Sequence, residues 1–417
     1  MHVGGRSWSI WLICTIFVAF QLFIGMLYGI AINQLSSSLA ISSSEVSKLV
    51  SIYFLAYAVM QIPMGVIMDK FSSKYVLTIS ALIISLGLFI IAGTHSFGIA
   101  AFASIIMGAA SSSVFIGAII MNSRWFPEKM FSIVTGMTSG FNGLIAAVIG
   151  FFIVRFISVG SLQISITAIL GIIIAVFILF IVKNKPVEIV KDGSVKAKTG
   201  IWQMLAKSIA NKEIIYATLG TTFVYGAMLA FITFWNFDYQ LKYNLSMSTI
   251  TLLNITILAG LAVGAPISGL ISERMHKRKP VALFMCICLF IVLIVVLQPI
   301  DIPTPLLFIV MFILGLFSNN VAVGFSMIKE NSESEYVGTA IAFANTILFL
   351  GLSALQFVPG ELITFFNSHQ SLFFESKYIT HDLSLVSNAL YIFPIVVIVA
   401  FICFFLSKET HCKPVKH

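Results

Sequence analysis

Twelve apolar segments follow one another along the chain, and they constrain its fold more than any other feature. A helix needs about 20 largely apolar residues to cross the hydrocarbon core of a bilayer. Apolar residues make up 59% of the chain and charged residues only 10%, too few charges to keep a soluble surface of this size wetted. The sequence therefore predicts an all-α membrane protein and excludes a soluble enzyme or a disordered chain. The predicted transmembrane helices occupy residues 10–32, 46–68, 75–94, 98–122, 131–157, 162–182, 214–236, 249–271, 280–298, 305–327, 337–360 and 387–406.

The distribution of Lys and Arg predicts how these helices are oriented. Connections on the cytoplasmic side of a membrane are enriched in both residue types. If the N-terminus lies in the cytoplasm, 20 of the 24 basic residues fall on that side, and only Lys48, Arg155, Lys242 and Lys377 fall on the other. A missed or additional helix would scramble this asymmetry, so the charge count also supports twelve spans. Both termini are predicted to be cytoplasmic.

A long basic connection divides the chain into two halves. Residues 183–213 carry seven Lys and separate the first six predicted spans from the last six. We therefore expect an N-terminal six-helix bundle at 1–182, a cytoplasmic linker at 183–213 and a C-terminal six-helix bundle at 214–417. The composition of the linker suits a solvated tether, or alternatively a segment that contacts anionic lipid headgroups.

The two halves also repeat a short motif after their second helix. A glycine, an acid, a base and a later base recur with one offset of 204 residues. Parallel repeats of this kind are related by an axis along the membrane normal, so we expect two pseudo-symmetric bundles. The first copy consists of Gly65, Asp69, Lys70 and Lys74, and the second of Gly269, Glu273, Arg274 and Arg278.

This motif resembles the signature loop of the major facilitator superfamily, Gly-x-x-x-Asp-[Arg/Lys]-x-Gly-[Arg/Lys]-[Arg/Lys]. The chain departs from it at Ser72 and His276, where the family usually has glycine, and at Ser73, where it usually has a base. Residues 124–127 (Arg-Trp-Phe-Pro) and 408–410 (Lys-Glu-Thr) are also similar to the superfamily. Together they resemble a bacterial branch that includes organic-anion exchangers and phagosomal amino-acid permeases. The resemblance implies that the protein lies in a bacterial cytoplasmic (inner) membrane.

The resemblance implies a role for the repeated loops. In the superfamily the two bundles rock about a central site, so the cytoplasmic side must close in one state and part in the other. We expect Asp69 and Glu273 to accept hydrogen bonds from the opposite bundle in the closed state, with Lys70, Lys74, Arg274 and Arg278 completing the gate. Gly65 and Gly269 are expected to let helix backbones approach. The alternative for any one acid is a solvated loop charge.

Neutral polar residues lie near the middle of several predicted spans, whereas charged residues do not. By the predicted boundaries, Asp238 lies in an outward loop and Glu361 lies just past the eleventh span. Neutral amides and hydroxyls suit a small polar or zwitterionic solute, although such residues also join lipid-buried helices to one another. The predicted solute contacts are Gln21, Ser112 (beside Ser111 and Ser113), Asn142, Tyr225, Asn319, Asn320 and Asn345.

Two further residues are candidates for the same site. Tyr57 shares a helix face with Tyr53 and Gln61, which suits a cavity lining or bundle packing. Arg155, at the outward end of the fifth span, could hold a carboxylate, or it could extend to the membrane interface.

The sequence thus favours a permease that moves a small polar solute, with an amino acid or dipeptide as the leading candidate. The alternatives are an exporter of drugs, siderophores or metabolites and a non-transporting membrane sensor. An enzyme is disfavoured because we find no nucleophile–base set or phosphate loop. We expect no cofactor, metal or nucleic-acid partner, and a monomer that contacts only lipid and solute. Coupling to protons or sodium, exchange and uniport all remain open.

Overall fold

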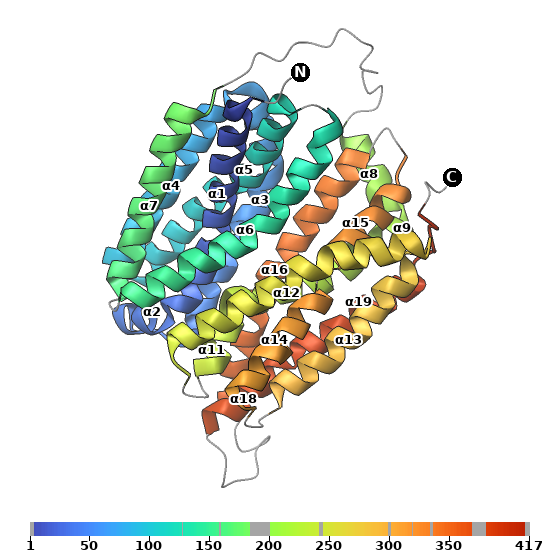
Figure 1. The fold of residues 1–417 in the computed structure, drawn as a ribbon. Coiled ribbons are helices and arrows are strands. Elements are labelled where there is room, and N and C mark those ends of the chain that lie inside the picture. The colour runs from blue at the N-terminus through green and yellow to red at the C-terminus, as the bar shows by residue number, and fades with distance from the viewer. Residues whose placement is uncertain are drawn as a thin grey trace. The chain divides into compact units, whose positions relative to one another are not determined.

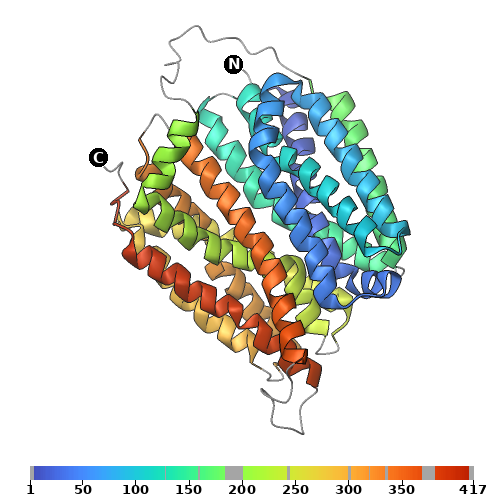
Figure 2. The same ribbon diagram turned by 180° about the vertical axis from the view of Figure 1, so that it is seen from behind.

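The structure is a computed structural model that describes residues 4–126, 128–157, 160–183, 201–241, 245–298, 302–318, 320–333, 337–368 and 381–412. Throughout these residues the regular structure is helical (Figures 1 and 2). The chain groups into two compact units. The N-terminal unit comprises Met1–Val190, Asn236–Asp238 and Ser246–Leu252, and the C-terminal unit comprises Lys191–Trp235, Tyr239–Leu245 and Leu253–His417.

The N-terminal unit is built from long apolar helices that pack side by side. In it, α3 packs on α5, α4 packs on α5 and α7, and α1 packs on α6 (Figure 1). A short helix that the sequence analysis did not predict, α2, follows the first span. The helices are α1 Gly5–Ile30, α2 Ile32–Leu39, α3 Ser43–Lys70, α4 Ser73–Gly93, α5 Phe97–Trp125, α6 Glu128–Phe156 and α7 Gly160–Ile181.

The seventh span combines several helical segments, two of them π-helical. It consists of α9 Lys212–Thr221, η1 Thr222–Gly226, α10 Ala227–Ala230, η2 Phe231–Trp235 and α11 Asn236–Leu241, where η marks a π-helical turn. The remaining helices are α8 Ile201–Ala210, α12 Met247–Arg274, α13 Lys279–Leu297, α14 Thr304–Ser318, α15 Val321–Glu330, α16 Val337–Ser368, α18 His381–Leu390 and α19 Ile392–Leu406.

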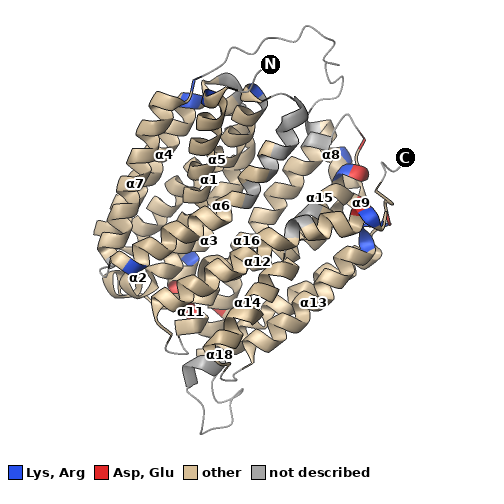
Figure 3. Cartoon of the chain, viewed as in Figure 1, with Lys and Arg blue, Asp and Glu red and all other residues tan. Residues whose placement is uncertain are grey.

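Eleven helices in the described residues are long and apolar enough to cross a membrane. The fifth predicted span, 131–157, corresponds to α6, in which Phe141–Phe156 forms a shorter apolar helix. In the N-terminal unit, α7 has no charged residue, and α1, α4 and α5 each have one, close to a helix end, so their middle parts are tan in Figure 3. This pattern places the charges where water or lipid headgroups can solvate them.

Several helices extend further than the apolar segments suggested, and this corrects two predicted positions. Asp238 lies within α11, at the end of the span Lys212–Leu241, and is 3% exposed, so it is not a loop residue. Glu361 lies inside α16, which continues to Ser368, and not beyond the end of the helix. Its side chain is half-buried. Polar residues and Pro359 interrupt the apolar pattern without ending the helix, because neighbouring helices can satisfy its backbone.

The described part of the linker is also helical. Residues 201–210 form α8, which packs on α16. Met204 accepts a hydrogen bond from Thr339, with 3.7 Å between the sulfur and oxygen atoms, and Lys207 pairs with Glu333 at 3.6 Å. This part of the connection is therefore a helix that packs on the C-terminal unit.

Glycine allows two helices of the C-terminal unit to pack backbone to backbone. A Cβ atom at Gly260 or Gly264 of α12 would overlap backbone atoms of α14 at Phe312 or Leu316. Conversely, a Cβ atom at Gly315 of α14 would overlap the carbonyl group of Ile257. The small residues at four-residue spacing in α12 thus form a helix interface, as is common in membranes.

Candidate functional site

Three helices of the N-terminal unit bring neutral polar side chains together at mid-depth. Gln21 Nε2 of α1 donates to the Tyr53 hydroxyl of α3 over 3.4 Å. The Tyr53 hydroxyl in turn donates to Ser111 Oγ of α5 over 3.0 Å. Gln21 is 7% exposed, whereas Tyr53 and Ser111 are fully buried. We call Gln21, Tyr53 and Ser111 the polar chain.

The structure places the other predicted contacts of this unit outside the polar chain. Ser112 donates to the Ala109 carbonyl of its own helix over 2.7 Å. Tyr57 is buried one turn from Tyr53, and Asn142 is half-buried on α6. Arg155 is exposed in the last turn of α6, a position from which an arginine can extend to the membrane interface. Their contacts with a solute remain predictions.

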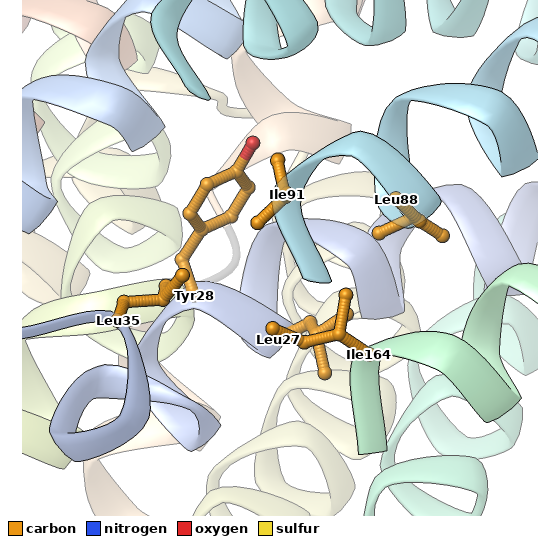
Figure 4. Close-up of a pocket in the computed structure, with 6 residues that line it drawn as sticks. All are labelled: Leu27, Tyr28, Leu35, Leu88, Ile91 and Ile164. Carbon is orange, nitrogen blue, oxygen red and sulfur yellow. The ribbon is translucent and has the colours of Figure 1, made fainter. Parts of the chain in front are cut away.

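The N-terminal unit also contains an apolar pocket, lined by residues of α1, α2, α4 and α7 (Figure 4). Its chemistry differs from that of the polar chain. Its one polar group is the hydroxyl of Tyr28, which lies 2.8 Å from Ser104 Oγ. Because that hydroxyl is already hydrogen-bonded, the pocket offers little to a polar solute. Its lining consists of Leu27, Tyr28, Leu35, Leu88, Ile91 and Ile164.

A second buried polar cluster, which the sequence analysis missed, joins α1, α5 and α6. Trp11 Nε1 donates to Thr138 Oγ1 over 2.9 Å, and Asn122 Nδ2 donates to the same oxygen over 3.3 Å. Thr138 donates to the Val134 carbonyl over 3.0 Å. Because Trp11, Asn122 and Thr138 all have hydrogen-bond partners, we interpret this cluster as a connection between helices.

In the C-terminal unit the predicted contacts are spread over three spans. Tyr225 lies in η1 and Asn345 lies in α16, and both are half-buried. Asn320 lies at the break between α14 and α15, is fully buried, and directs Nδ2 towards the Ala282 carbonyl of α13 at 3.5 Å. Asn319 lies outside the described residues. Asn320 thus approaches a neighbouring helix, which favours the interhelical interpretation of this residue.

The first copy of the gate motif ends α3 and begins α4. Asp69 and Lys70 are the last residues of α3, and Lys74 is half-buried in the first turn of α4. The side chains of Asp69 and Lys70 lie outside the described part of the structure. Beside them, Arg124 Nη1 donates to Ser73 Oγ over 3.3 Å, which ties the end of α5 to the start of α4.

The second copy contains a buried ion pair that the sequence analysis did not predict. Arg278 Nη2 and Nε donate to Glu330 Oε1 over 3.0 and 3.3 Å, and Arg278 Nη1 donates to Ser272 Oγ over 2.6 Å. The side chains of Arg278 and Glu330 are only 9% and 10% exposed. Glu273 and Arg274, in contrast, are exposed at the end of α12.

The guanidinium of Arg278 stays positively charged at physiological pH. Burial alone would lower the pKa of the Arg278 guanidinium, but its hydrogen bond with Glu330 and the negative charge of that carboxylate outweigh burial, and the pKa of Arg278 is raised. A raised pKa of a base means that its stabilising charge is lost only when the pH rises above that value. We call Arg278, Glu330 and Ser272 the arginine cluster.

The segment after α19 folds back onto the arginine cluster. The Glu409 carboxylate accepts hydrogen bonds from the backbone N–H groups of Arg278 (2.8 Å) and Lys279 (3.0 Å), which open α13. Thr410 donates its hydroxyl to Glu330. An acid at this position satisfies N–H groups that have no partner within the helix and complements its dipole. The 408–410 motif therefore fastens the segment after α19 to two helix ends of one unit, the start of α13 and the end of α15.

The two glycines of the motif have no close neighbour in the described part of the structure, and the helix approach predicted for them at the gate stays a prediction. Among the described residues, a Cβ atom built at Gly65 or Gly269 has no neighbour within 4 Å. Within the C-terminal unit, helix backbones approach closely at Gly260, Gly264 and Gly315. A gating role for the motif itself remains a prediction.

The two departures from the family's glycine have different consequences for the backbone. His276 has a φ of 50°, in the left-handed region that costs a non-glycine residue roughly 1–2 kcal/mol. Ser72 has a φ of −60° and needs no glycine. Glycine at this position would remove the backbone strain, but it also loses more backbone freedom on folding. We therefore expect His276→Gly to stabilise the protein by a net amount of about 0.5–1 kcal/mol. Thermal unfolding in detergent measures this, and Ser72→Gly, its control, should give no gain.

Comparison with known families agrees with this architecture. The family model of the Major Facilitator Superfamily matches residues 11–355 and 240–416. The chain belongs to this superfamily, whose members are multi-pass membrane transporters rather than enzymes. The predicted fold class, an all-α membrane protein with twelve transmembrane helices in two six-helix pseudo-symmetric bundles, is confirmed.

Individual relatives are distant. The hexuronate transporter of Bacillus subtilis (strain 168) is 25% identical over 259 residues, 60% of this chain and 60% of that protein, so the match spans less than two thirds of its length. A bacterial homolog of the human lysosomal transporter Spinster, inward-facing and unoccupied, has a TM-score of 0.79 at 14% identity over 97% of both chains. A D-xylose–proton symporter has a TM-score of 0.73 at 13% identity over 98% of this chain and 99% of that one.

Proposed function

We propose that the protein is a secondary-active or facilitative permease that moves a small polar organic solute across the membrane by alternating access. The observation that carries this proposal is the polar chain, which is neutral, mid-depth and shared by α1, α3 and α5. Polar groups in a membrane interior are kept where they are hydrogen-bonded or functional. Gln21 is the member of the polar chain with some exposure, so it is the one that can reach a solute.

Within this class, an amino acid or dipeptide is the solute we favour. Helix α15 begins at Val321 inside the tenth span, Thr304–Glu330, so the N–H groups of its first turn lie within the membrane. The N-terminus of a helix favours a carboxylate, and neutral amides and hydroxyls favour an ammonium or hydroxyl group beside it. Two of the similar proteins are named for hexuronate and D-xylose transport, so these solutes belong in the same test panel.

The acids of the repeated motif and the arginine cluster together support the gating part of the proposal. Asp69 and Glu273 each lie in the last turn of a helix, where an acid opposes the negative end of the helix dipole. We propose that this cost is accepted because the acids bind the opposite bundle when the cytoplasmic side closes. The arginine cluster and Glu409 would then keep the C-terminal bundle rigid while it moves.

The charge distribution supports an orientation with both termini in the cytoplasm of a bacterial inner membrane. A monomer surrounded by lipid suits the many apolar side chains that the long helices expose. Proton coupling is a second candidate for the energetics, because Asp238 and Glu361 lie inside spans. Both acids lie towards the predicted outward ends of their helices.

The proposal is tested in two steps. Thermal unfolding of the purified protein is first measured with amino acids, dipeptides, sugars, nucleosides and hexuronates, because a ligand of the folded state raises the melting temperature. Uptake and counterflow of the hits are then measured in proteoliposomes. Binding without counterflow would indicate a sensor, outward-directed flux an exporter, and no binding by any class would overturn the proposal.

Gln21→Leu is expected to weaken binding of such a hit about tenfold, because one hydrogen bond to the solute is lost while side-chain size is kept. Ser113→Ala is the matched control. Ser113 donates to Ser80 of α4 over 2.8 Å and lies outside the polar chain. Equal affinities of Gln21→Leu and the wild type would remove Gln21 from the site.

A further inference from the structure

The second π-helical turn of the seventh span is contacted by a buried glutamine from another helix. Gln356 of α16 directs Nε2 to Thr233 Oγ1 at 2.6 Å and to the Ala230 carbonyl at 3.3 Å. Gln356 and Thr233 are both fully buried. Ala230 ends α10 and Thr233 is the central residue of η2, so the glutamine contacts the junction where the helix changes its hydrogen-bond pattern.

Side chains satisfy the backbone at this junction. In a π turn each N–H group bonds one residue further back than in an α-helix, which disturbs the pairing of the carbonyls where the pattern changes. Thr233 donates to the Leu229 carbonyl over 2.6 Å, and Gln356 supplies the donor to the next carbonyl, Ala230. Trp235 Nε1 also donates to the Leu355 carbonyl of α16 over 3.2 Å. The π turn is thus held by two consecutive residues of α16.

The first π turn packs on the same helix. A Cβ atom at Gly226 would lie 3.4 Å from the Leu348 carbonyl, and Gly351 packs against the Thr222 side chain. The segment of α16 from Leu348 to Gln356 therefore follows the seventh span along both of its π turns. Sharp departures from the α-helical pattern have local causes, and α16 is the helix that contacts both of these π turns.

A π turn also determines which way the rest of its helix faces. It holds one more residue than an α turn, and one residue corresponds to a rotation of about 100°. The residues beyond η2 include Asn236, Asp238 and Gln240, which are all buried polar side chains. If η2 became α-helical without loss of a residue, these side chains would turn by that angle about the helix axis.

We propose that Gln356 is a positioning residue that fixes the π turn at Phe231–Trp235 and thereby the rotational setting of the outer end of the seventh span. This inference rests on the proposed function in one respect, namely that the seventh span lines the solute path. Gln356 Oε1 has no hydrogen-bond partner among the described residues, so the bonds that this side chain makes there are the two that Nε2 donates.

The test is hydrogen–deuterium exchange of the full-length protein in lipid nanodiscs, which needs no solute. Gln356→Met keeps the length of the side chain but donates nothing. We expect the amides of residues 231–236 to exchange at least tenfold faster in this variant, while other spans change less than threefold. Gln163→Met is the matched control, because Gln163 also donates to a backbone carbonyl, that of Ile157, over 2.7 Å but in the N-terminal unit.

Two further variants separate positioning from simple packing. Thr233→Val, which keeps the shape and removes the hydroxyl, should raise exchange of the same amides about threefold, and it serves if Gln356→Met does not fold. Removal of Thr233 in the Gln356→Met background shortens the π turn at Phe231–Trp235 from five residues to four. Four residues suit an α turn and keep the residues that follow in their original rotational setting. This removal should restore slow exchange and the melting temperature of the wild type.

The proposal is overturned if residues 231–236 exchange less than threefold faster in Gln356→Met, if Gln163→Met has the same effect on them, or if removal of Thr233 rescues nothing. A failure to find any transported solute would instead count against the proposed function and leave these exchange results unchanged.

Discussion

Replacement of Arg278 with alanine is expected to destabilise the folded protein by about 3 kcal/mol, because removal of one partner leaves the other charge of a buried pair uncompensated. Glu330 would lose both of its bonds from the guanidinium, and Ser272 would lose the bond from Nη1. Glu330 is at most 10% exposed, so water could replace these bonds only after the end of the unit opens. Thermal and denaturant unfolding in one detergent measure the change.

Arg274→Ala is the matched control for this prediction. Arg274 belongs to the same motif and carries the same charge, but its side chain is exposed, so its removal should change stability by less than about 0.5 kcal/mol. A double-mutant cycle with Glu330→Gln should give a coupling energy of about 1–3 kcal/mol for Arg278. Equal destabilisation by Arg278→Ala and Arg274→Ala would show that the buried pair contributes nothing specific.

Gly264→Ala is expected to destabilise the protein by about 2–3 kcal/mol, because the added methyl group overlaps the backbone of a neighbouring helix. The atoms it would meet belong to the Leu316 backbone of α14, which cannot move aside as a flexible side chain could. The two helices must therefore separate, and contacts along their whole interface weaken. Unfolding curves measured as for Arg278→Ala test this expectation.

Gly269→Ala, on the same helix, is the control. Its Cβ atom would meet no described atom within 4 Å, and alanine has a higher helix propensity than glycine by about 1 kcal/mol. We expect a neutral or slightly stabilising effect on unfolding. If Gly269→Ala proved as harmful as Gly264→Ala, the motif glycine would contact a partner that this arrangement of the chain does not contain.

The sequence alone predicts the fold well because hydrophobic segments and basic connections are local patterns. The span at 75–94 coincides with α4, Ser73–Gly93, almost to the residue. The eleventh span predicted at 337–360 is too short, since α16 continues through Pro359 and Gly360 to Ser368. Whether such a helix continues depends on neighbours that supply hydrogen bonds, and those neighbours cannot be identified from a local pattern.

The site was harder to predict because its contacts join distant parts of the chain. The depth of Gln21 in its predicted span marks it as a candidate, whereas the sequence relates its partner Tyr53 only to a helix face that includes Tyr57. The motif indicates Arg278, but its partner Glu330 is 52 residues away and lies at a helix end like many solvated acids. Gln356 contacts Thr233 across 123 residues, and no spacing in the sequence indicates that pairing.

The central claim, alternating access to a polar site, is tested most directly by the accessibility of one residue from both sides of the membrane. Gln21→Cys is introduced into a chain whose five native cysteines are replaced, and a membrane-impermeant thiol reagent is applied to either face of sealed vesicles. The account predicts that the thiol is modified from the outer face and, in separate vesicles, from the inner face. Modification from one face only, or from neither, would contradict it.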